Sequence, residues 1–337
     1  MAGGGNSGRF RNSRWRNCDK LFTGSREQIF KLNNSANYMK KEMQKICFIV
    51  NPISGANRKP QKIVHWIEEV FRASGQQVDI RYTRERRDAI RLAREAADQN
   101  FDMVVAVGGD GTINEIGRSL VHSQVVLGIV PAGSGNGFAR NFHIPLDQYK
   151  AIKLLRNPTV RAIDVGRLNR HYFFNVAGMG LDAEISRRFE DFGQRGPLPY
   201  FLIGTRAFMQ YQPEQVTLHF ENQSIEFSPL LLSIANAPQY GNGAVIAPAA
   251  KPDDQLLDVI VLDPMPIWKA APNIYRLFNG TIDQVEEFHS FQVKKVVIER
   301  AAPGSIHTDG DPYREAAELE IEAIPSALLV AVENSQA

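Results

Sequence analysis

The stretch "VVAVGGDGTINEIG", residues 104–117, joins four apolar residues to a glycine-rich turn and a segment of helical character. The apolar run predicts a buried β-strand, and a short helix follows it. Glycines at such a junction allow close approach of the backbone, so that consecutive N–H groups face a ligand, naturally an anion. Asp110 would repel phosphate unless a divalent cation or a substrate proton lay between them. The stretch therefore predicts a site for a metal-bound nucleotide; the alternative is a tight turn capped by an aspartate.

Two further strand ends share this design. "LGIVPAGSGNGFARNF", residues 127–142, runs from an apolar strand through Pro131 into glycines and then into a helix. "NPISG", residues 51–55, follows the strand "KICFIV". Neither a Walker A loop nor the dinucleotide GxGxxG fingerprint is present. Glycine-rich ends on neighbouring strands of one sheet can hold one polyphosphate between them.

The remaining pattern predicts two halves. Apolar strands alternate with amphipathic helices over residues 43–162, which predicts a parallel sheet wrapped by helices, with ligands beyond the carboxyl ends of the strands. Residues 163–337 contain many short strands joined by turns, which predicts an antiparallel β-sandwich. A boundary of this kind favours a small-molecule site in the cleft between the halves.

Residues 1–42 differ in composition from the rest. They carry nine Lys/Arg and three Asp/Glu residues, in a chain whose total net charge is +2. With no sustained apolar period, this leader is predicted to be disordered. The favoured interpretation is a segment ahead of a true start at Met39 or Met43. The alternative interpretation is that these residues form a basic arm that binds nucleic acid or an anionic membrane. Because the first interpretation is favoured, we do not expect nucleic acid as a partner.

The location of the chain follows from what the sequence lacks. No apolar run is long enough to span a bilayer, and the N-terminus has no signal-peptide core. Cys18 and Cys47 show neither metal-type spacing nor a disulfide framework. We expect a cytoplasmic protein, peripheral at most to the inner face of the membrane.

Five motifs occur in a recognisable order: "NPISG", "GGDGTINE", "PAGSGNGFAR", "IAPAAKPDDQLLDV" and "TDGDP". Together they resemble the diacylglycerol kinase catalytic domain family, which includes bacterial lipid kinases and sphingosine kinases, over about residues 44–335. The resemblance implies an α/β domain like that of NAD kinase and phosphofructokinase, followed by a lipid-binding β-sandwich. It also implies an enzyme that transfers the γ-phosphate of ATP to a lipid hydroxyl with Mg²⁺.

The resemblance assigns the nucleotide contacts to the glycine-rich strand ends. The residues concerned are Asn51, Ser54, Thr83, Gly108, Gly109, Asp110, Gly111, Thr112, Ile113, Asn114, Gly133, Ser134, Gly135 and Asn136. Bacterial lipid kinases place the proton acceptor at the position of Asp309, and sphingosine kinases place it at that of Asp110. Both are candidate catalytic residues.

The same resemblance implies a metal site at Lys251, Asp254 and Leu256, and lipid head-group contacts at Asp182 or Glu184. Three positions depart from the family pattern. Gly137 replaces an acid often linked to metal or phosphate, Asp311 replaces a longer glutamate, and Gln255 stands where the metal loop usually has glycine. A side chain at the last position threatens the backbone turn that aims the carbonyl groups.

Two aromatic-rich stretches, "PLPYFLIGTRAFMQY" (197–211) and "PMPIWKAAPNIYRLF" (264–278), can border a lipid slot or dock on a bilayer surface. Burial in the second half is the favoured alternative for most of their residues. Rival functions are a soluble-metabolite kinase of the NAD kinase type and a non-catalytic nucleotide- or lipid-binding protein. The sequence does not identify the acceptor lipid. A homodimer is compatible with it.

Overall fold

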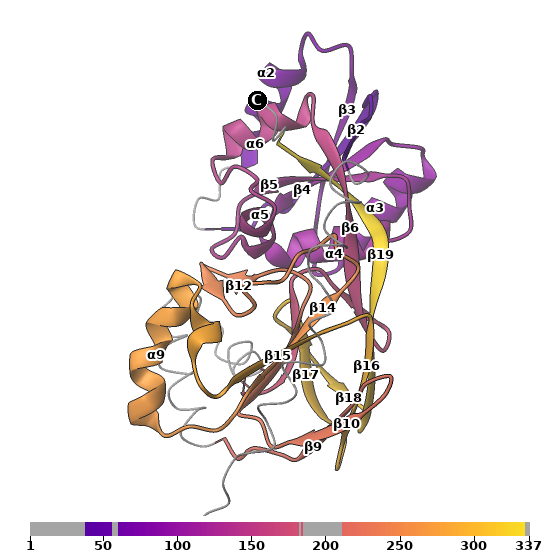
Figure 1. Ribbon diagram of the computed structural model, residues 1–337. Helices are drawn as coiled ribbons and strands as arrows, with labels where there is room; N and C mark the ends of the chain where they lie inside the picture. Colours follow the sequence, from indigo (N-terminus) through magenta and orange to yellow (C-terminus); the bar gives the residue numbers. More distant parts are fainter. Residues whose placement is uncertain (1–37, 56–59, 182, 185–210, 334–337) are drawn as a thin grey trace, which may run out of the picture. The chain divides into compact units, whose positions relative to one another are not determined.

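The computed structural model describes residues 38–55, 60–181, 183–184 and 211–333 (Figure 1). Its first half is built on a parallel sheet with the strand order β5-β4-β2-β3. These strands are β2 (Lys45–Val50), β3 (Gln77–Tyr82), β4 (Met103–Gly108) and β5 (Val126–Pro131). Every residue of β4 and β5 is buried, as expected when helices cover both faces of a parallel sheet.

Alternate residues of each strand face two separate cores. Cys47 and Ile49 pack with residues of α3, α4 and α5, whereas Ile46 and Phe48 pack with residues of α2 and α6. The helices are α2 (Pro60–Phe71), α3 (Asp88–Asp98), α4 (Asp110–Leu120), α5 (Gly137–Asn141) and α6 (Gln148–Leu155). The predicted alternation of strand and helix is confirmed.

The last strand connects this sheet to the second half. β19 (Glu318–Val332) pairs in parallel with β5 near its end, and antiparallel with β16 (Lys295–Arg300) near its start. Along most of its length it also pairs with β6 (Thr159–Leu168), which β7 (His171–Phe173) extends. Figure 1 shows β19 in yellow running alongside β6.

The second half is a sandwich of two antiparallel layers. One layer continues the first sheet through β16, β9 (Val216–His219) and β10 (Ser224–Phe227). The other is a separate six-stranded sheet. Its order is β15 (Phe288–Val293), β14 (Leu257–Leu262), β11 (Leu231–Ala235), β8 (Val176–Gly180), β17 (Gly304–Thr308) and β18 (Asp311–Glu315). Apolar residues of both layers form one core, and the predicted fold class is confirmed.

Smaller elements complete the sandwich. β12 (Gln239–Gly241) and β13 (Ala244–Val245) form a short hairpin. Helix α9 (Ile267–Asn279) ends at Gly280, which has a φ of 71°, and the 3₁₀ turn η2 (Ile282–Gln284) follows. Among the described residues, no helix has the length and apolar character needed to cross a bilayer.

The prediction of a disordered leader is corrected at its end. Tyr38–Lys40 form strand β1, with Met39 opposite Val160 of β6. The edge of β6 carries backbone hydrogen-bonding groups that a further strand can pair. Met43 is only 2% exposed and belongs to the core shared with α2 and α6.

Candidate active site

The three predicted glycine-rich loops lie in contact at the carboxyl ends of β2, β4 and β5. The Asn51 N–H donates to the Val107 carbonyl at 2.9 Å, and the Ala132 N–H donates to the Gly108 carbonyl at 2.7 Å. The Ser54 hydroxyl reaches the Ala132 carbonyl at 3.3 Å. The structure therefore brings together strand ends that are about 80 residues apart in the sequence.

Glycine is required where these loops meet. A Cβ on Gly133 would lie 2.6 Å from the Cα of Gly109. A Cβ on Gly55, whose φ is 77°, would lie 2.2 Å from the Ala132 carbonyl oxygen. Because real Cβ contacts are longer than this, side chains at these positions would push the loops apart.

Asp110 is the first residue of α4 and points toward the loop that follows β5. Its Oδ1 accepts the Phe138 N–H at 3.2 Å. Burial raises the pKa of Asp110, and the N–H groups of Gly137, Phe138 and Asn136 act in the opposite direction. The carboxylate therefore binds the start of α5 and ties two of the loops together, rather than capping its own helix α4.

Some of the other predicted nucleotide contacts are exposed and others are buried. Gly111 and Ser134 are exposed. Thr112 accepts a hydrogen bond from the Asn51 side chain at 3.0 Å. Asn114 is 1% exposed, and neither polar atom of its side chain has a hydrogen-bond partner among the described residues. Ile113 is completely buried in the core and its N–H binds the Gly109 carbonyl, so its side chain offers nothing to a ligand.

Three further positions complete the set. Asn136 has a φ of 48°, and its side chain exchanges two hydrogen bonds with Gly133, at 2.9 and 3.0 Å. Gly135 lies beside Asp110, because a Cβ there would be 3.1 Å from Oδ2. The Thr83 N–H donates to the Val50 carbonyl at 3.0 Å, which places Thr83 at the end of β3 beside the Asn51 loop.

Asp309, the second candidate base, lies in the tight turn between β17 and β18. Its carboxylate accepts the N–H groups of Phe174, Asn175 and Val176 at 2.9, 2.8 and 3.1 Å. Its φ of 51° is the left-handed conformation that a non-glycine residue rarely adopts. Burial raises the pKa of Asp309, while the charge of Arg118 and these N–H groups oppose the rise.

Hydrogen bonds connect each of the two candidate bases to helix α5. Asn141, at the end of α5, donates to the Asn175 side chain at 2.7 Å. The Asn175 N–H in turn donates to Asp309. Since Asp110 caps the start of the same five-residue helix, both carboxylates are anchored to α5.

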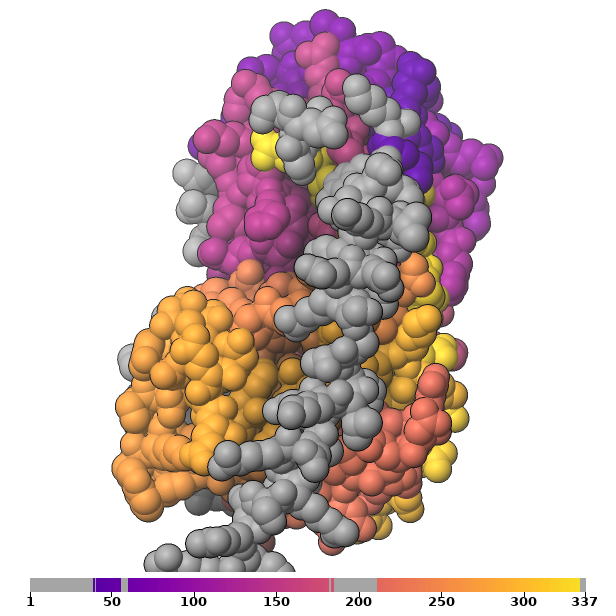
Figure 2. Space-filling model, in the orientation of Figure 1, coloured from indigo at the N-terminus to yellow at the C-terminus, as the bar shows by residue number. Residues whose placement is uncertain are grey.

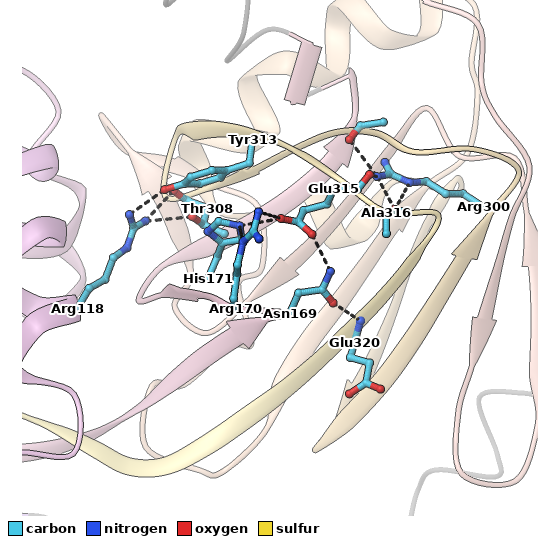
Figure 3. Close-up of polar contacts among 11 residues, drawn as sticks. Arg118, Asn169, Arg170, His171, Arg300, Thr308, Tyr313, Glu315, Ala316 and Glu320 are labelled. Atoms are coloured by element: carbon cyan, nitrogen blue, oxygen red, sulfur yellow. Dashed lines mark hydrogen bonds and ion pairs between the residues drawn. The ribbon is translucent and has the colours of Figure 1, made fainter.

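Arg118 was not predicted as a site residue. Figure 3 shows it reaching from α4 toward Thr308 and Tyr313 of the β17–β18 hairpin. Its guanidinium donates to Asp311 Oδ2, the Tyr313 hydroxyl and Thr308 Oγ1, each at 3.0 Å. The helix that begins at Asp110 therefore also holds the turn that carries Asp309. The only sequence signal was a basic residue eight positions after Asp110.

The far end of the hairpin has its own anchor (Figure 3). Glu315 accepts hydrogen bonds from Asn169 at 3.0 Å and from His171 at 2.9 Å, and it forms an ion pair with Arg170 at 3.1 Å. Asp311, one methylene shorter than the usual glutamate, still reaches Arg118.

The predicted metal loop precedes β14. Burial raises the pKa of Asp254 to about 6, and the charges of Asp164 and Asp253 add to the rise. Burial likewise raises the pKa of Asp258 to about 7. Carboxylates that resist ionisation gain from a nearby cation, and oxygen donors suit Mg²⁺. No group of three carboxylate, imidazole or thiol side chains able to hold a metal occurs in the described part of the chain.

Gln255 does not prevent the turn of this loop. Its φ is 65°, the left-handed conformation that glycine would take, and its N–H donates to Asp164 Oδ2 at 2.6 Å. The Leu256 N–H donates to Asp254 Oδ1 at 3.1 Å. The donor types therefore fit a cation held by the Asp254 carboxylate and the backbone carbonyls of Lys251 and Leu256.

The predicted lipid contacts are only partly described. Glu184 is half-buried in a helical turn after β8, whereas Asp182 lies outside the described residues. Residues 197–210 of the first aromatic-rich stretch also lie outside them. The second stretch includes α9, and none of the residues of that helix is buried, so the favoured burial is wrong for α9.

Comparison with known proteins agrees with this geometry. Residues 45–168 match the diacylglycerol kinase catalytic domain, and residues 175–332 match the YegS C-terminal NAD kinase beta sandwich-like domain. A Chromohalobacter salexigens protein named probable lipid kinase YegS-like is 31% identical over 79% of this chain and 87% of its own length. The diacylglycerol kinase of Bacillus subtilis is 30% identical over 65% of this chain and 74% of its own.

Solved structures show the same fold. A Bacillus anthracis protein described as a diacylglycerol kinase superimposes with a TM-score of 0.76 at 25% identity, over 91% of this chain and 100% of its own. The chain therefore belongs to the diacylglycerol kinase catalytic domain family, which confirms the resemblance seen in the sequence. It is a kinase.

Proposed function

We propose that this kinase transfers the γ-phosphate of ATP to the hydroxyl group of a membrane lipid, with Asp309 as the general base. The proposal rests mainly on one observation. The turn that holds Asp309 is attached, through Arg118 and through Asn141 and Asn175, to the two helices that begin at the glycine-rich loops. In this scheme the lipid hydroxyl would lie between Asp309 and the phosphates of a nucleotide held by those loops.

The loops supply the nucleotide site in this scheme. Backbone N–H groups at the start of α4, together with exposed Gly111 and Ser134, would face the phosphates. The buried Asn114 amide supports the same assignment, because an unpaired buried amide is costly unless a ligand binds it. Asp110 caps α5 and is assigned to positioning the loops.

The reaction then needs one proton transfer and one phosphoryl transfer. Asp309 accepts the proton of the lipid hydroxyl while the oxygen attacks the γ-phosphorus, and the bond from that phosphorus to the β–γ bridging oxygen breaks, leaving ADP. The raised pKa of Asp309 brings this carboxylate closer to the pH at which a general base is most effective. Mg²⁺, when bound, neutralises phosphate charge. Asp254, Lys251 and Leu256 are the residues that would hold it in the proposed loop.

The left-handed backbone of Asp309 favours this assignment over Asp110. Strained non-glycine residues persist where the surrounding structure enforces them, and they concentrate at functional sites. Asp110, by contrast, lies at an ordinary helix start and already has a capping role.

The test measures transfer of radiolabelled phosphate from ATP to a panel of acceptors. The panel contains diacylglycerol, phosphatidylglycerol, a sphingoid base and a long-chain alcohol in micelles, with NAD as the soluble acceptor. We expect Asp309→Asn to lower kcat about 100-fold or more with little change in the KM for ATP. Asp110→Asn should mainly raise that KM.

Exposed Asp283→Asn is the matched control and should behave like the unaltered chain. Near-normal turnover by folded Asp309→Asn protein would remove the assignment of the base. Transfer to NAD alone would favour a soluble-metabolite kinase, and ATP binding without any transfer would favour a non-catalytic homologue.

A further inference from the structure

Helix α9 presents its apolar face to solvent. None of its 13 residues is buried. Five of its large apolar side chains, Ile267, Trp268, Ile274, Tyr275 and Phe278, are between 43% and 77% exposed. Spacings of seven and of three or four residues place these side chains on one side of the helix. The surface of this segment, orange in the colour scale, is visible on the face shown in Figure 2.

The opposite side of α9 faces the protein. It carries Leu277, which packs against the buried cluster that includes Val176 and Ile260, together with Lys269 and Arg276. Lys269 pairs with Glu286, at 3.1 Å, and with Glu287. Arg276 donates to the Gln284 side chain at 2.9 Å. A surface helix normally turns its apolar stripe toward the core and its charges toward water. In α9 the larger apolar stripe faces solvent, while Leu277, Lys269 and Arg276 contact the protein, so an apolar partner is needed to cover the stripe.

We propose that α9 is the element by which this kinase docks on the membrane, with its apolar face inserted into the interfacial region of the bilayer. The inference rests on the proposed lipid acceptor, because such an acceptor is reached only at a lipid surface. The composition of the stripe supports it, since tryptophan and tyrosine are the residues enriched at the boundary between acyl chains and water.

The size of the face argues against a second copy of the chain as the partner. The five exposed apolar side chains of α9 together offer on the order of 500 Å². A stable protein–protein interface needs about 800 Å² from each partner. Insertion into a bilayer has no such threshold, because each apolar side chain contributes separately.

The charge of this half specifies the mode of docking. Residues 163–337 contain thirteen Lys/Arg and twenty-three Asp/Glu, so the net charge of this half does not attract anionic lipids. Binding through α9 therefore depends on apolar insertion and should respond little to salt.

The binding test uses flotation with phosphatidylcholine vesicles and compares the full chain with its Trp268→Ala/Phe278→Ala variant. We expect the variant to partition about tenfold or more weakly, because two inserted aromatic side chains are lost. Leu146→Ala, at an apolar residue 41% exposed in the α/β half, is the matched control and should bind normally. Raising the salt from about 0.1 to 0.5 M should change the binding of the unaltered chain less than about twofold.

Activity provides the second measurement. The variant should lose transfer to a vesicle-borne acceptor but keep its kcat toward a short-chain acceptor dissolved in water. Vesicle binding is scored separately, so failure to find any lipid acceptor would overturn the proposed function and leave the docking result standing. Equal vesicle binding by variant and unaltered chain would overturn the inference. So would a dimer that the variant converts to monomer.

Discussion

Arg118 shows how one side chain can serve both halves of the site. Its helix begins at the Asp110 loop, and its guanidinium binds Thr308, Asp311 and Tyr313 in the sandwich. Its positive charge also lowers the pKa of Asp309 against the larger effect of burial. The residue therefore acts on Asp309 through both position and charge.

We predict a change in pH dependence when this charge is removed. In Arg118→Met the pKa of Asp309 should rise further, because burial is then less opposed. A base must be ionised to act, so the acid limb of kcat/KM should move to higher pH. Activity at pH 7 should fall about tenfold or more, with partial recovery at pH 9.

Arg118→Lys keeps the charge and should retain the original acid limb. Arg170→Gln is the matched control, since Arg170 is 78% exposed and pairs with Glu315 in the same region. If Arg118→Met lowered kcat/KM equally at every pH, Arg118 would only hold the structure and would not tune the pKa of Asp309.

At the scale of elements, the β12–β13 hairpin explains a departure from the family pattern. A Cβ on Gly137 would lie 2.6 Å from the Tyr240 carbonyl oxygen and 3.1 Å from the Cα of Gly241. The hairpin therefore packs directly on the first residue of α5. Glycine stands where the family often has an acid because this contact leaves no space for a side chain.

We predict that Gly137→Ala destabilises the protein by about 1–3 kcal/mol, because the contact is with backbone that cannot move aside. Urea unfolding measures this free energy. Gly111→Ala serves as the comparison, since a Cβ there meets nothing within 4 Å, and it should change stability by less than about 0.5 kcal/mol. Equal midpoints for the two variants would contradict the packing argument.

At the scale of the whole molecule, β19 belongs to both halves. It pairs with β5 beside the glycine-rich loops and with β16 in the sandwich. Leu328 and Val330 lie in a core of the α/β half, and Leu319 and Ile321 lie in the sandwich core. β19 therefore contributes side chains to a core of the α/β half and to the core of the sandwich.

We predict a single unfolding transition for the whole chain. In a Trp15→Phe/Trp268→Phe background, which leaves Trp66 as the single tryptophan, the fluorescence of Trp66 on α2 should follow the α/β half, and far-UV circular dichroism should follow all elements. The two urea midpoints should coincide, as cooperative unfolding requires. Separate midpoints would show that β19 does not couple the halves.

The sequence by itself determined the fold class and the composition of the loops. Period-two and helical patterns are local, so they predicted the parallel α/β half and the sandwich. Glycine at Gly109 and Gly133 predicted close backbone approach, which the structure shows. The motif order predicted the family. Burial of α9 was predicted wrongly, because its pattern gives the apolar stripe but not the direction in which it faces.

Only the tertiary structure decided which distant residues meet. The bonds of Arg118 to Thr308 and Asp311 span 190 and 193 residues, and no local pattern records such a contact. The sequence also did not predict that the first sheet continues into the sandwich, since strand pairing depends on which edges meet in space. The orientation of α9 was hidden as well, because Leu277 packs on the sandwich and Lys269 pairs with Glu286 and Glu287 only after the chain has folded.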